Sequence, residues 1–414
     1  MDAPTASQNG SSLANAFVAR QAIFDLKLDV VGYELLFRQQ AHDQAAHFSD
    51  RDQASVRVLL DSFLDLGLDQ LVGQLPAFLN LTRTFFLSAQ NMPLPRDRVV
   101  LELLEDEVVD APLIESIRGY AQSGYRIALD DFVYQPHFDP LLEIADIVKI
   151  DVLALSPSEI AEQVRMVRPF DVVLLAEKVE TTEHLEFCKD LGFDLFQGYF
   201  LCRPNVVGGH RIPANRLATL RLLAKLQDPH VEIDTLERII REDLSLSYKL
   251  LRLINSAFYG LPQKVESIRQ TLVLLGLHHI RAWVSLLTLS ALDDKPDELM
   301  VTAMVRARMC EQLADRAGVA NPDVYFTAGL FSTLDALLDM SMEDIVEQLP
   351  LASDLNTALL NREGRMGQAL ECVVAYERGD WEKVGFGRLE SSEIRGAYLD
   401  AVEWSATAGR EIGL

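Results

Sequence analysis

Cysteine is scarce in this chain, and no two cysteines have the spacing of a metal or redox motif. The four cysteines among 414 residues never stand as CxxC; they are Cys188, Cys202, Cys310 and Cys372. This scarcity excludes a disulfide-stapled domain and a cysteine-rich zinc module. Isolated cysteines in a large chain predict free thiols in a reducing compartment.

Positive charge is also in short supply. Lys and Arg number 38 against 62 Asp and Glu, so the formal net charge is −24. An electrostatic field of this sign repels phosphate, which excludes a general binder of nucleic acid polymers or of anionic membrane surfaces. A local basic pocket for a small anion remains compatible with this charge.

A secretory signal and a long apolar run are both missing. The first residues, MDAPTASQNGSSLANAF, have no basic start and no apolar core. The longest apolar stretch, around residues 282–292, is interrupted by Ser and Thr, and it falls short of the roughly 18 residues that span a bilayer. We therefore expect a cytoplasmic protein without a membrane span, with residues 1–16 as a disordered tail.

Short apolar runs of β type alternate with amphipathic helical patterns from residue 17 to residue 204. Such alternation is typical of βα units around a buried parallel sheet. Seven or eight strands in this span favour a TIM-like (β/α) barrel, and an open doubly wound sheet is the alternative. The predicted strands are residues 30–37, 77–81, 99–105, 126–132, 147–152, 172–179 and 194–200, and the predicted helices are residues 54–68, 111–125, 156–167 and 181–193.

Proline and glycine punctuate the stretch around residues 201–216, where the pattern of the chain changes. This punctuation predicts a linker at residues 205–216. Beyond it nearly all of the patterning is helical, and no period-two runs stand out. The predicted fold class is therefore α/β plus all-α, with a barrel over residues 17–204 and an all-helical domain over residues 217–414.

Polar side chains stand near the carboxyl ends of the predicted strands, where the active sites of (β/α) barrels lie. Taken singly, each has an ordinary explanation as a solvated loop residue or a helix cap. Taken together, several lie inside otherwise apolar strands, where a bare carboxylate is costly unless it is paired or binds a metal. These residues are Glu34, Arg38, Asn80, Glu102, Glu105, Asp130, Asp131, Lys149, Asp151, Glu177, Glu180 and Gln197.

One lysine cannot neutralise so many carboxylates, whereas a divalent cation can. An all-oxygen donor set suits Mg²⁺, Mn²⁺ or Ca²⁺ rather than Zn²⁺. The adjacent Asp130 and Asp131 are suited to bridging two ions, an arrangement that hydrolyses phosphodiesters by activating water and stabilising the leaving oxygen. Lys149 is then a candidate to hold the attacking water or to offset developing charge.

The same residues lie in motifs that resemble those of EAL domains, which are cyclic-di-GMP phosphodiesterases. ELLFR (34–38) is similar to the family's ExLxR signature. The later motifs keep the family's order and spacing, and they are NLT (80–82), ELLE (102–105), DDF (130–132), KID (149–151), AEKVE (176–180) and QGYF (197–200). The resemblance implies a TIM-like barrel that opens cyclic di-GMP to linear pGpG with Mg²⁺ or Mn²⁺.

The resemblance also implies a role for each residue. The ligands of one ion would be Glu34, Asn80, Glu102 and Asp130, and those of a second ion Asp130, Asp131 and Glu177. Lys149 would contact the attacking water. Glu177 is also a candidate general base, so its role stays open between the two. The candidate catalytic residues are Glu177, Lys149 and Glu34, the candidate substrate contacts are Arg38, Gln197 and Glu180, and Glu105 would support the loop after Asp131.

The chain departs from the family pattern at Leu35, Leu104, Lys178 and the loop after Asp131, and the last two bear on the site. Lys178 stands where a glycine is usual. Active members usually read DDFGTGYSS, whereas residues 130–138 read DDFVYQPHF, without either glycine and with an added proline. A loop that needs positive φ cannot keep its shape without glycine, which predicts either a weak second ion site or a rebuilt loop. Barrels of this family often pair through that loop, so a homodimer is one expectation.

Residues 243–284 resemble the core of HDOD domains, which are all-α relatives of the HD phosphohydrolases that lack the metal dyad. The motifs INSAFYG (254–260) and SIRQTLVLLG (267–276) carry the match, with IRAW soon after. No histidine follows His279, and Ser332 and Thr333 stand where an HD dyad is expected. We therefore predict no catalysis in this domain and a regulatory role through a protein partner.

Three functions remain open at this point. The first is a metal-dependent cyclic-di-GMP phosphodiesterase, supported by the complete carboxylate set. The second is a catalytically weak or silent receptor for cyclic di-GMP, supported by the altered loop. The third is a pure protein-interaction scaffold, which the carboxylates argue against because an unused buried cluster costs stability.

Overall fold

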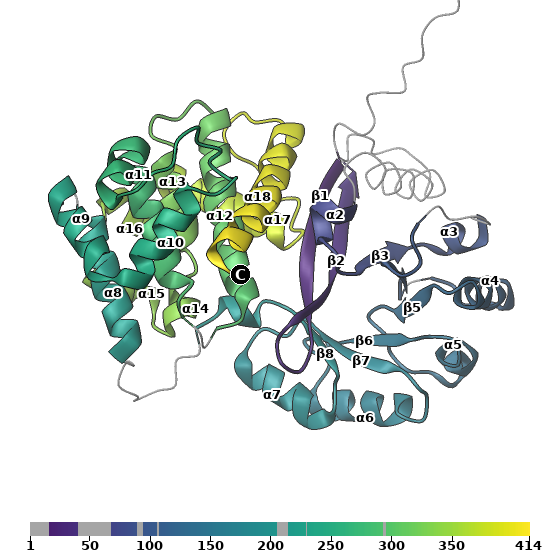
Figure 1. The fold of residues 1–414 in the computed structure, drawn as a ribbon. Coiled ribbons are helices and arrows are strands. Elements are labelled where there is room, and N and C mark those ends of the chain that lie inside the picture. Colours follow the sequence, from purple (N-terminus) through teal and green to yellow (C-terminus); the bar gives the residue numbers. More distant parts are fainter. Residues whose placement is uncertain are drawn as a thin grey trace, which may run out of the picture. The chain divides into compact units, whose positions relative to one another are not determined.

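The computed structural model of the chain describes residues 16–39, 68–88, 94–105, 107–204, 214–228, 230–292 and 295–414. Two compact units divide the chain. The first consists of Met1–Phe200 with the short segment Glu377–Trp381, and the second consists of Leu201–Tyr376 and Glu382–Leu414. Within the described ranges, the strands belong to the first unit and the second unit is built from helices (Figure 1).

Eight strands form a closed barrel in the first unit, which confirms the predicted TIM-like barrel. Strands β2 to β8 pair in parallel, each with the next along the chain. Strand β1 pairs antiparallel with both β2 and β8 and closes the barrel. The strands are β1 Ala16–Phe24, β2 Val30–Gln39, β3 Ala77–Leu81, β4 Val99–Leu103, β5 Arg126–Leu129, β6 Ile147–Asp151, β7 Val173–Glu177 and β8 Leu195–Gln197.

The predicted parallel sheet holds for β2 to β8 but not for β1, which is antiparallel to both of its neighbours. The sequence pattern predicts no strand over the residues of β1. A tight turn joins β1 to β2: the backbone N–H groups of Lys27 and Asp29 both donate to Asp25 Oδ1, at 2.8 and 3.0 Å. Leu28 in this turn has a φ of 67°. A connection this short can join only antiparallel strands, because a parallel pair needs a long crossover.

Alternation along the strands places a polar layer on top of an apolar layer inside the barrel. Side chains two residues apart in a strand face the same side. The apolar layer is a buried cluster of Ile23, Phe78, Val100, Ala128, Ile147 and Leu175. Two residues beyond the last five of these along the chain stand Asn80, Glu102, Asp130, Lys149 and Glu177. The period-two pattern therefore gathers the polar side chains at the carboxyl ends of the strands.

Helices with clear caps connect the strands of the barrel. Asp110 caps α4, and Ser156 forms a capping box with Glu159 on α6. These helices, with α7, confirm the predicted helices at residues 111–125, 156–167 and 181–193, while the one predicted at 54–68 lies outside the described residues apart from residue 68. The helices are α2 Leu68–Val72, α3 Arg83–Ser88, α4 Ala111–Gln122, α5 Asp139–Leu142, α6 Pro157–Val167 and α7 Thr182–Leu191, with short 3₁₀ turns η2 Pro136–Phe138 and η3 Phe200–Cys202.

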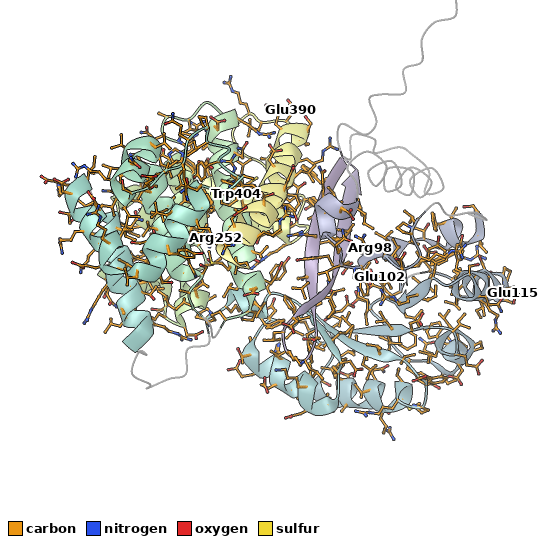
Figure 2. The ribbon with its side chains drawn as sticks, in the orientation of Figure 1. Arg98, Glu102, Glu115, Arg252, Glu390 and Trp404 are labelled. Atoms are coloured by element: carbon orange, nitrogen blue, oxygen red, sulfur yellow. The ribbon has the colours of Figure 1, made fainter. Side chains whose placement is uncertain are left out.

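The second unit packs around α12, which contacts α13 and α18. A side chain at Gly329 of α13 would overlap the backbone of Arg306 on α12, so glycine lets the two helices approach closely. Trp404 of α18, labelled in Figure 2, stacks obliquely on Trp283 of α11 with ring centroids 5.6 Å apart. The helices are α8 Ala214–Gln227, α9 Ile233–Glu242, α10 Leu244–Ile254, α11 Ile268–Leu289, α12 Asp297–Arg316, α13 Asp323–Phe331, α14 Leu334–Leu338, α15 Met342–Gln348, α16 Ser353–Asn361, α17 Gly364–Glu377 and α18 Ser391–Ile412.

Helix α11 corrects the expectation that no apolar segment reaches the length of a membrane span. By length and composition alone, α11 is the one helix among the described residues that is long and apolar enough to cross a bilayer. About 44% of its most apolar window is buried inside the protein. The helix is also interrupted at Gly276, whose φ of 77° and ψ of 166° are not helical.

We predict that Gly198→Ala will destabilise the barrel strongly. Gly198 follows β8 with a φ of 150°, and a Cβ there would overlap the backbone of Val179 in the loop after β7. The loss in free energy of unfolding should be about 2–4 kcal/mol, measured by urea denaturation. The matched control is Gly119→Ala on the exposed face of α4, where a Cβ meets nothing within 4 Å and alanine should stabilise the helix slightly. Equal stability of both variants would contradict the prediction.

Candidate active site

A buried lysine lies at the centre of the polar layer. The side chain of Lys149 on β6 has no exposed surface, and its Nζ faces four carboxylates. The distances are 2.7 Å to Asp130 Oδ1, 2.9 Å to Glu177 Oε1, 3.0 Å to Glu102 Oε1 and 3.3 Å to Glu34 Oε2. Glu102 is labelled in Figure 2 among the barrel strands. The fold thus brings four of the predicted metal ligands together around the predicted catalytic lysine.

Two amide side chains orient Glu34. Asn80 Nδ2 donates to Glu34 Oε1 at 2.6 Å, and Gln197 Nε2 donates to Glu34 Oε2 at 2.6 Å. Gln197 Nε2 also lies 3.0 Å from Gln21 Oε1 on β1. The sequence-based reasoning missed Gln21. Only the register of the β1–β2 hairpin, which pairs Gln21 with Glu34, shows that this residue belongs to the site.

A second ammonium group, that of Lys178, pairs with two carboxylates outside the inner cluster. Lys178 Nζ lies 2.5 Å from Asp151 Oδ2, and 3.3 and 3.2 Å from Asp131 Oδ1 and Oδ2. Both Asp131 and Lys178 have left-handed backbones, with φ of 40° and 57°. Asp131 therefore faces Lys178, whereas its neighbour Asp130 faces Lys149.

Burial dominates the protonation of the inner carboxylates. Desolvation raises the pKa of Glu102 well above its usual value and raises that of Glu177 to about 8, although Lys149 opposes both shifts. Burial also raises the pKa of Asp130. Glu34 is the exception, because Lys149 and the two amide donors outweigh burial and lower its pKa. Of these carboxyl groups, Glu177, with a pKa of about 8, retains its proton at neutral pH.

The carboxylate partners of Lys149 and Lys178 stabilise the charged form of both lysines. Burial by itself lowers the pKa of Lys149, but Glu102, Glu34, Glu177 and Asp130 outweigh it and raise that pKa well above its usual value. For Lys178 partial burial is likewise outweighed, by the hydrogen bond to Asp151 and the charge of Asp131, so its pKa is raised as well. Both side chains are therefore ammonium groups at neutral pH.

The donor atoms of the inner cluster fit a divalent cation. Asn80 Oδ1, Glu102 Oε2 and Glu177 Oε2 are buried without a hydrogen-bond partner, and such oxygens are what Mg²⁺, Mn²⁺ and Ca²⁺ prefer. Over the residues that the structure describes, no three acidic, His or Cys side chains form a ready metal cage. The Lys149 ammonium lies among the carboxylates instead, so coordination of an ion requires it to shift aside.

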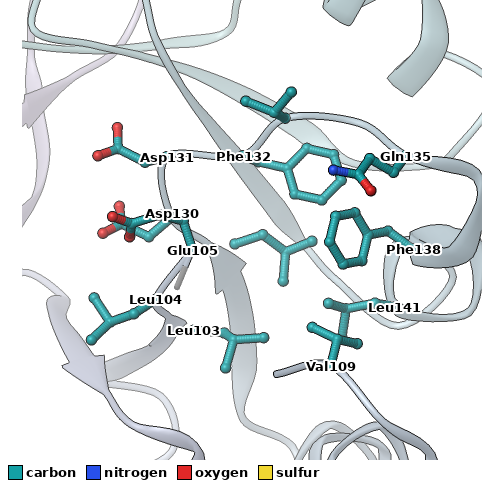
Figure 3. A pocket seen from close by; sticks show the side chains of 12 residues that line it. Leu103, Leu104, Glu105, Val109, Asp130, Asp131, Phe132, Gln135, Phe138 and Leu141 are labelled. Carbon is teal, nitrogen blue, oxygen red and sulfur yellow. The ribbon is translucent and has the colours of Figure 1, made fainter. Parts of the chain in front are cut away.

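A cavity of about 230 Å³ opens beside Asp130 and Asp131. Figure 3 shows these carboxylates on one side and Phe132, Phe138 and Leu141 on the other. No residue of the loop 132–138 has a positive φ. The backbone N–H of Tyr134 donates to Gln163 Oε1 at 2.6 Å, and its Oη donates to Asp139 Oδ1 at 3.0 Å. The loop is therefore built in a form that needs no glycine.

The other predicted site residues lie around this cluster. Glu105 is exposed after β4 and lines the same cavity as Asp131. Glu180 is half-buried in the loop after β7. Arg38 belongs to β2, but its side chain lies outside the described part of the structure. The roles predicted for these three residues stay predictions.

We predict that the contribution of Glu177 to the free energy of unfolding falls as pH rises from about 5 to about 8. The folded-state pKa of about 8 exceeds the ordinary value of 4.5, so between them the folded state binds the extra proton, and this advantage is lost as pH rises. In chelator-treated protein, Glu177→Gln should therefore gain stability relative to wild type by on the order of 1 kcal/mol per pH unit across this window.

Urea unfolding at a series of pH values measures this difference. Glu115→Gln, at an exposed position of α4 that Figure 2 labels, is the matched control and should show no such trend. A difference between wild type and Glu177→Gln that is constant with pH would contradict the assigned shift.

Comparisons with known proteins identify both units. The family model described as EAL domain matches residues 34–204, and the model described as HDOD domain matches residues 212–376. The Vibrio cholerae protein named cyclic di-GMP phosphodiesterase CdgJ is 34% identical over 409 residues, which cover 97% of this chain and 95% of that protein. The Bacillus subtilis protein YuxH is 34% identical over 400 residues, covering 94% of this chain and 97% of that protein.

Several solved structures resemble part of the chain. The Bacillus subtilis YkuI protein, which has an EAL domain and was solved with cyclic di-GMP and calcium, is 21% identical with a TM-score of 0.38, covering 56% of this chain and 72% of that one. Klebsiella pneumoniae BlrP1, solved with calcium and cyclic di-GMP, is 23% identical with a TM-score of 0.38, covering 47% and 57%. The full-length match to CdgJ and the two family models confirm the predicted order of domains. The chain therefore belongs to the family of proteins in which an EAL domain is followed by an HDOD domain.

Proposed function

We propose that this chain is a metal-dependent phosphodiesterase that hydrolyses cyclic di-GMP to linear pGpG at the carboxyl end of its barrel. The observation that carries the proposal is the buried cluster in which four carboxylates surround one lysine and several oxygens lack hydrogen-bond partners. The name of the Vibrio cholerae relative, a cyclic di-GMP phosphodiesterase, supports the same activity.

The residues of the inner cluster divide into ligands and proton carriers. Glu34, Asn80, Glu102 and Asp130 would hold the divalent ion, which is Mg²⁺ or Mn²⁺ in our proposal. When bound, such an ion activates water and stabilises charge on a phosphate. Lys149, freed from the ligands, would hold the attacking water. Burial raises the pKa of Glu177 to about 8. Once binding of the ion has displaced this proton, Glu177 would accept the proton of the water as general base.

The charge of the substrate explains why the site needs added positive charge. Cyclic di-GMP carries two phosphodiester anions, and the carboxylates that line the site repel them. The divalent ion removes this repulsion where the scissile phosphate must lie. Arg38 and Glu180 remain proposed substrate contacts, whereas the hydrogen bond of Gln197 to Glu34 favours a role in orienting that ligand.

The HDOD domain, in our proposal, regulates the barrel or recruits a protein partner and performs no catalysis. Ser332 and Thr333 stand at the position of an HD dyad, and their hydroxyls donate to the backbone carbonyls of Gly329 and Leu330. Such short hydroxyl side chains, already bonded to backbone carbonyls of α13, are poor ligands for a divalent metal. We also propose a cytoplasmic location and retain a homodimer as part of the proposal.

A second candidate function is a receptor that binds cyclic di-GMP without hydrolysing it. The observation in its favour is the pairing of Asp131 with Lys178, which takes one predicted ligand away from the inner cluster. A receptor would bind cyclic di-GMP in the presence of a chelator and release no product.

We predict that Glu34→Ala abolishes hydrolysis while the protein stays folded. Glu34 is a ligand that both Asn80 and Gln197 orient, and loss of a ligand should cost more than the roughly 100-fold that loss of an outer partner costs. The measurement is chromatography of pGpG after incubation with cyclic di-GMP and Mn²⁺, with circular dichroism to check the fold. The exposed Glu115→Ala on α4 should keep wild-type turnover.

Turnover by Glu34→Ala at the wild-type rate would contradict the assignment of the site. Absence of pGpG with wild-type protein, together with calorimetric binding of cyclic di-GMP under chelation, would favour the receptor.

We also predict that Mn²⁺ stabilises the protein and displaces protons. At a free concentration of about 100 times Kd, binding adds about 2.7 kcal/mol to the free energy of unfolding, which raises Tm by on the order of 5–10 °C. Burial raises the pKa of Glu177 to about 8 and that of Glu102 well above its usual value. A bound cation lowers these pKa values, so calorimetry in two buffers of different ionisation enthalpy should report proton release. A Tm that does not respond to Mn²⁺ would count against a metal-dependent enzyme.

A further inference from the structure

The side chain of Lys178 lies beside Asp131, one of the carboxylates that the second ion would need. Its Nζ lies 3.3 and 3.2 Å from the two oxygens of Asp131 and 2.5 Å from Asp151 Oδ2. About half of the Lys178 side chain is exposed, whereas its two partners are 30% and 14% exposed. The ammonium therefore lies at the mouth of the site and not in its core.

The backbone of Lys178 is strained. Lys178 has a φ of 57° and Asp131 a φ of 40°, in the left-handed region that side chains with a Cβ rarely adopt. Glycine, which is usual at position 178 in the family that the sequence resembles, would adopt this backbone without strain. Strain of this kind is retained only where surrounding interactions hold it. Here the two ion pairs of Lys178 are joined by the hydrogen bonds of the next residue, from Val179 N–H to the Gln197 carbonyl at 2.9 Å and from Phe200 N–H to the Val179 carbonyl at 3.1 Å.

The two lysines divide the acidic residues into separate groups. Lys149 holds Glu34, Glu102, Asp130 and Glu177, and Lys178 holds Asp131 and Asp151. A metal ion bound to Asp131 would sit about 2.0–2.6 Å from its oxygens. Both oxygens of Asp131 already contact this ammonium, which competes for the same space and repels a divalent ion by its charge. The inner cluster differs, because Asn80 Oδ1, Glu102 Oε2 and Glu177 Oε2 have no hydrogen-bond partner and stay available to a cation.

We propose that the ammonium of Lys178 takes the place of a second divalent ion beside Asp131, so that the site of this chain holds one ion instead of two. The inference rests on the proposed function, because it presumes that the inner cluster binds the first ion. It assigns Asp131 as the partner of Lys178 and not as a metal ligand. Lys178 thereby supplies fixed positive charge at the outer side of the site, independent of the metal concentration.

The test counts Mn²⁺ ions bound to the full-length protein. Equilibrium dialysis followed by metal analysis gives the number of ions per chain, and electron paramagnetic resonance distinguishes an isolated ion from a coupled pair about 4 Å apart. We expect one ion per chain and an uncoupled spectrum for wild type. Lys178→Gly, which removes both the charge and the backbone strain, should bind two ions and give a coupled spectrum.

Two further variants separate charge from folding. Lys178→Met removes the charge but keeps a long, unbranched side chain and the left-handed backbone at this position. This variant should also bind two ions. Adding Asp131→Asn to Lys178→Gly should return the count to one. The matched control is Lys189→Ala on α7, a lysine that pairs with Glu186 at 2.9 Å away from the site, and it should bind one ion as wild type does.

The outcomes distinguish this inference from the proposed function. Two ions in wild type, or one ion in both Lys178 variants with folding verified by circular dichroism, would overturn the inference while the proposed function stands. No bound ion in wild type together with no hydrolysis would overturn the proposed function, and the inference with it.

Discussion

The burial of one ammonium among four carboxylates is the interaction on which the rest of the barrel's polar layer depends. Lys149 has no exposed surface, and removing its charge would leave Glu34, Glu102, Asp130 and Glu177 facing one another without compensation. Buried charges of this kind are tolerated only when paired. Even so, the carboxylates outnumber the lysine, and burial raises the pKa of both Glu102 and Glu177, that of Glu177 to about 8.

This imbalance links stability to chemistry. Protons retained by buried carboxylates are displaced when a cation takes their place, so metal affinity, pH and folding stability are coupled through the same side chains. The charge of Lys149, together with the amides of Asn80 and Gln197, lowers the pKa of Glu34 and favours its ionised form. The site therefore contains both a carboxylate ready to bind a cation and a carboxyl group, Glu177, with a pKa suited to proton transfer near neutrality.

Lys178 adds a second centre of positive charge at the outer side of the same site. Its contacts with Asp131 and Asp151 lie outside the group held by Lys149. The loop over residues 132–138 closes through Tyr134 without a residue of positive φ. Two departures from the family pattern, the lysine and the loop, thus lie on the same side of the site, around Asp131. The inner cluster keeps every ligand type that the resemblance implies.

The alternation of short apolar runs with amphipathic helical patterns was sufficient to predict the barrel and the helices α4, α6 and α7, because each pattern is typical of one kind of secondary structure. The positions of Glu102, Asp130, Lys149 and Glu177 near the carboxyl ends of the predicted strands indicated that these side chains meet, because those ends lie at one side of a (β/α) barrel. The hairpin that makes β1 antiparallel escaped prediction, since only closure of the barrel shows where that strand pairs. The partition of Asp130 and Asp131 between two lysines was likewise decided by tertiary structure. Adjacent residues leave a strand end in different directions, and the left-handed backbones of Asp131 and Lys178 determine which ammonium each carboxylate meets.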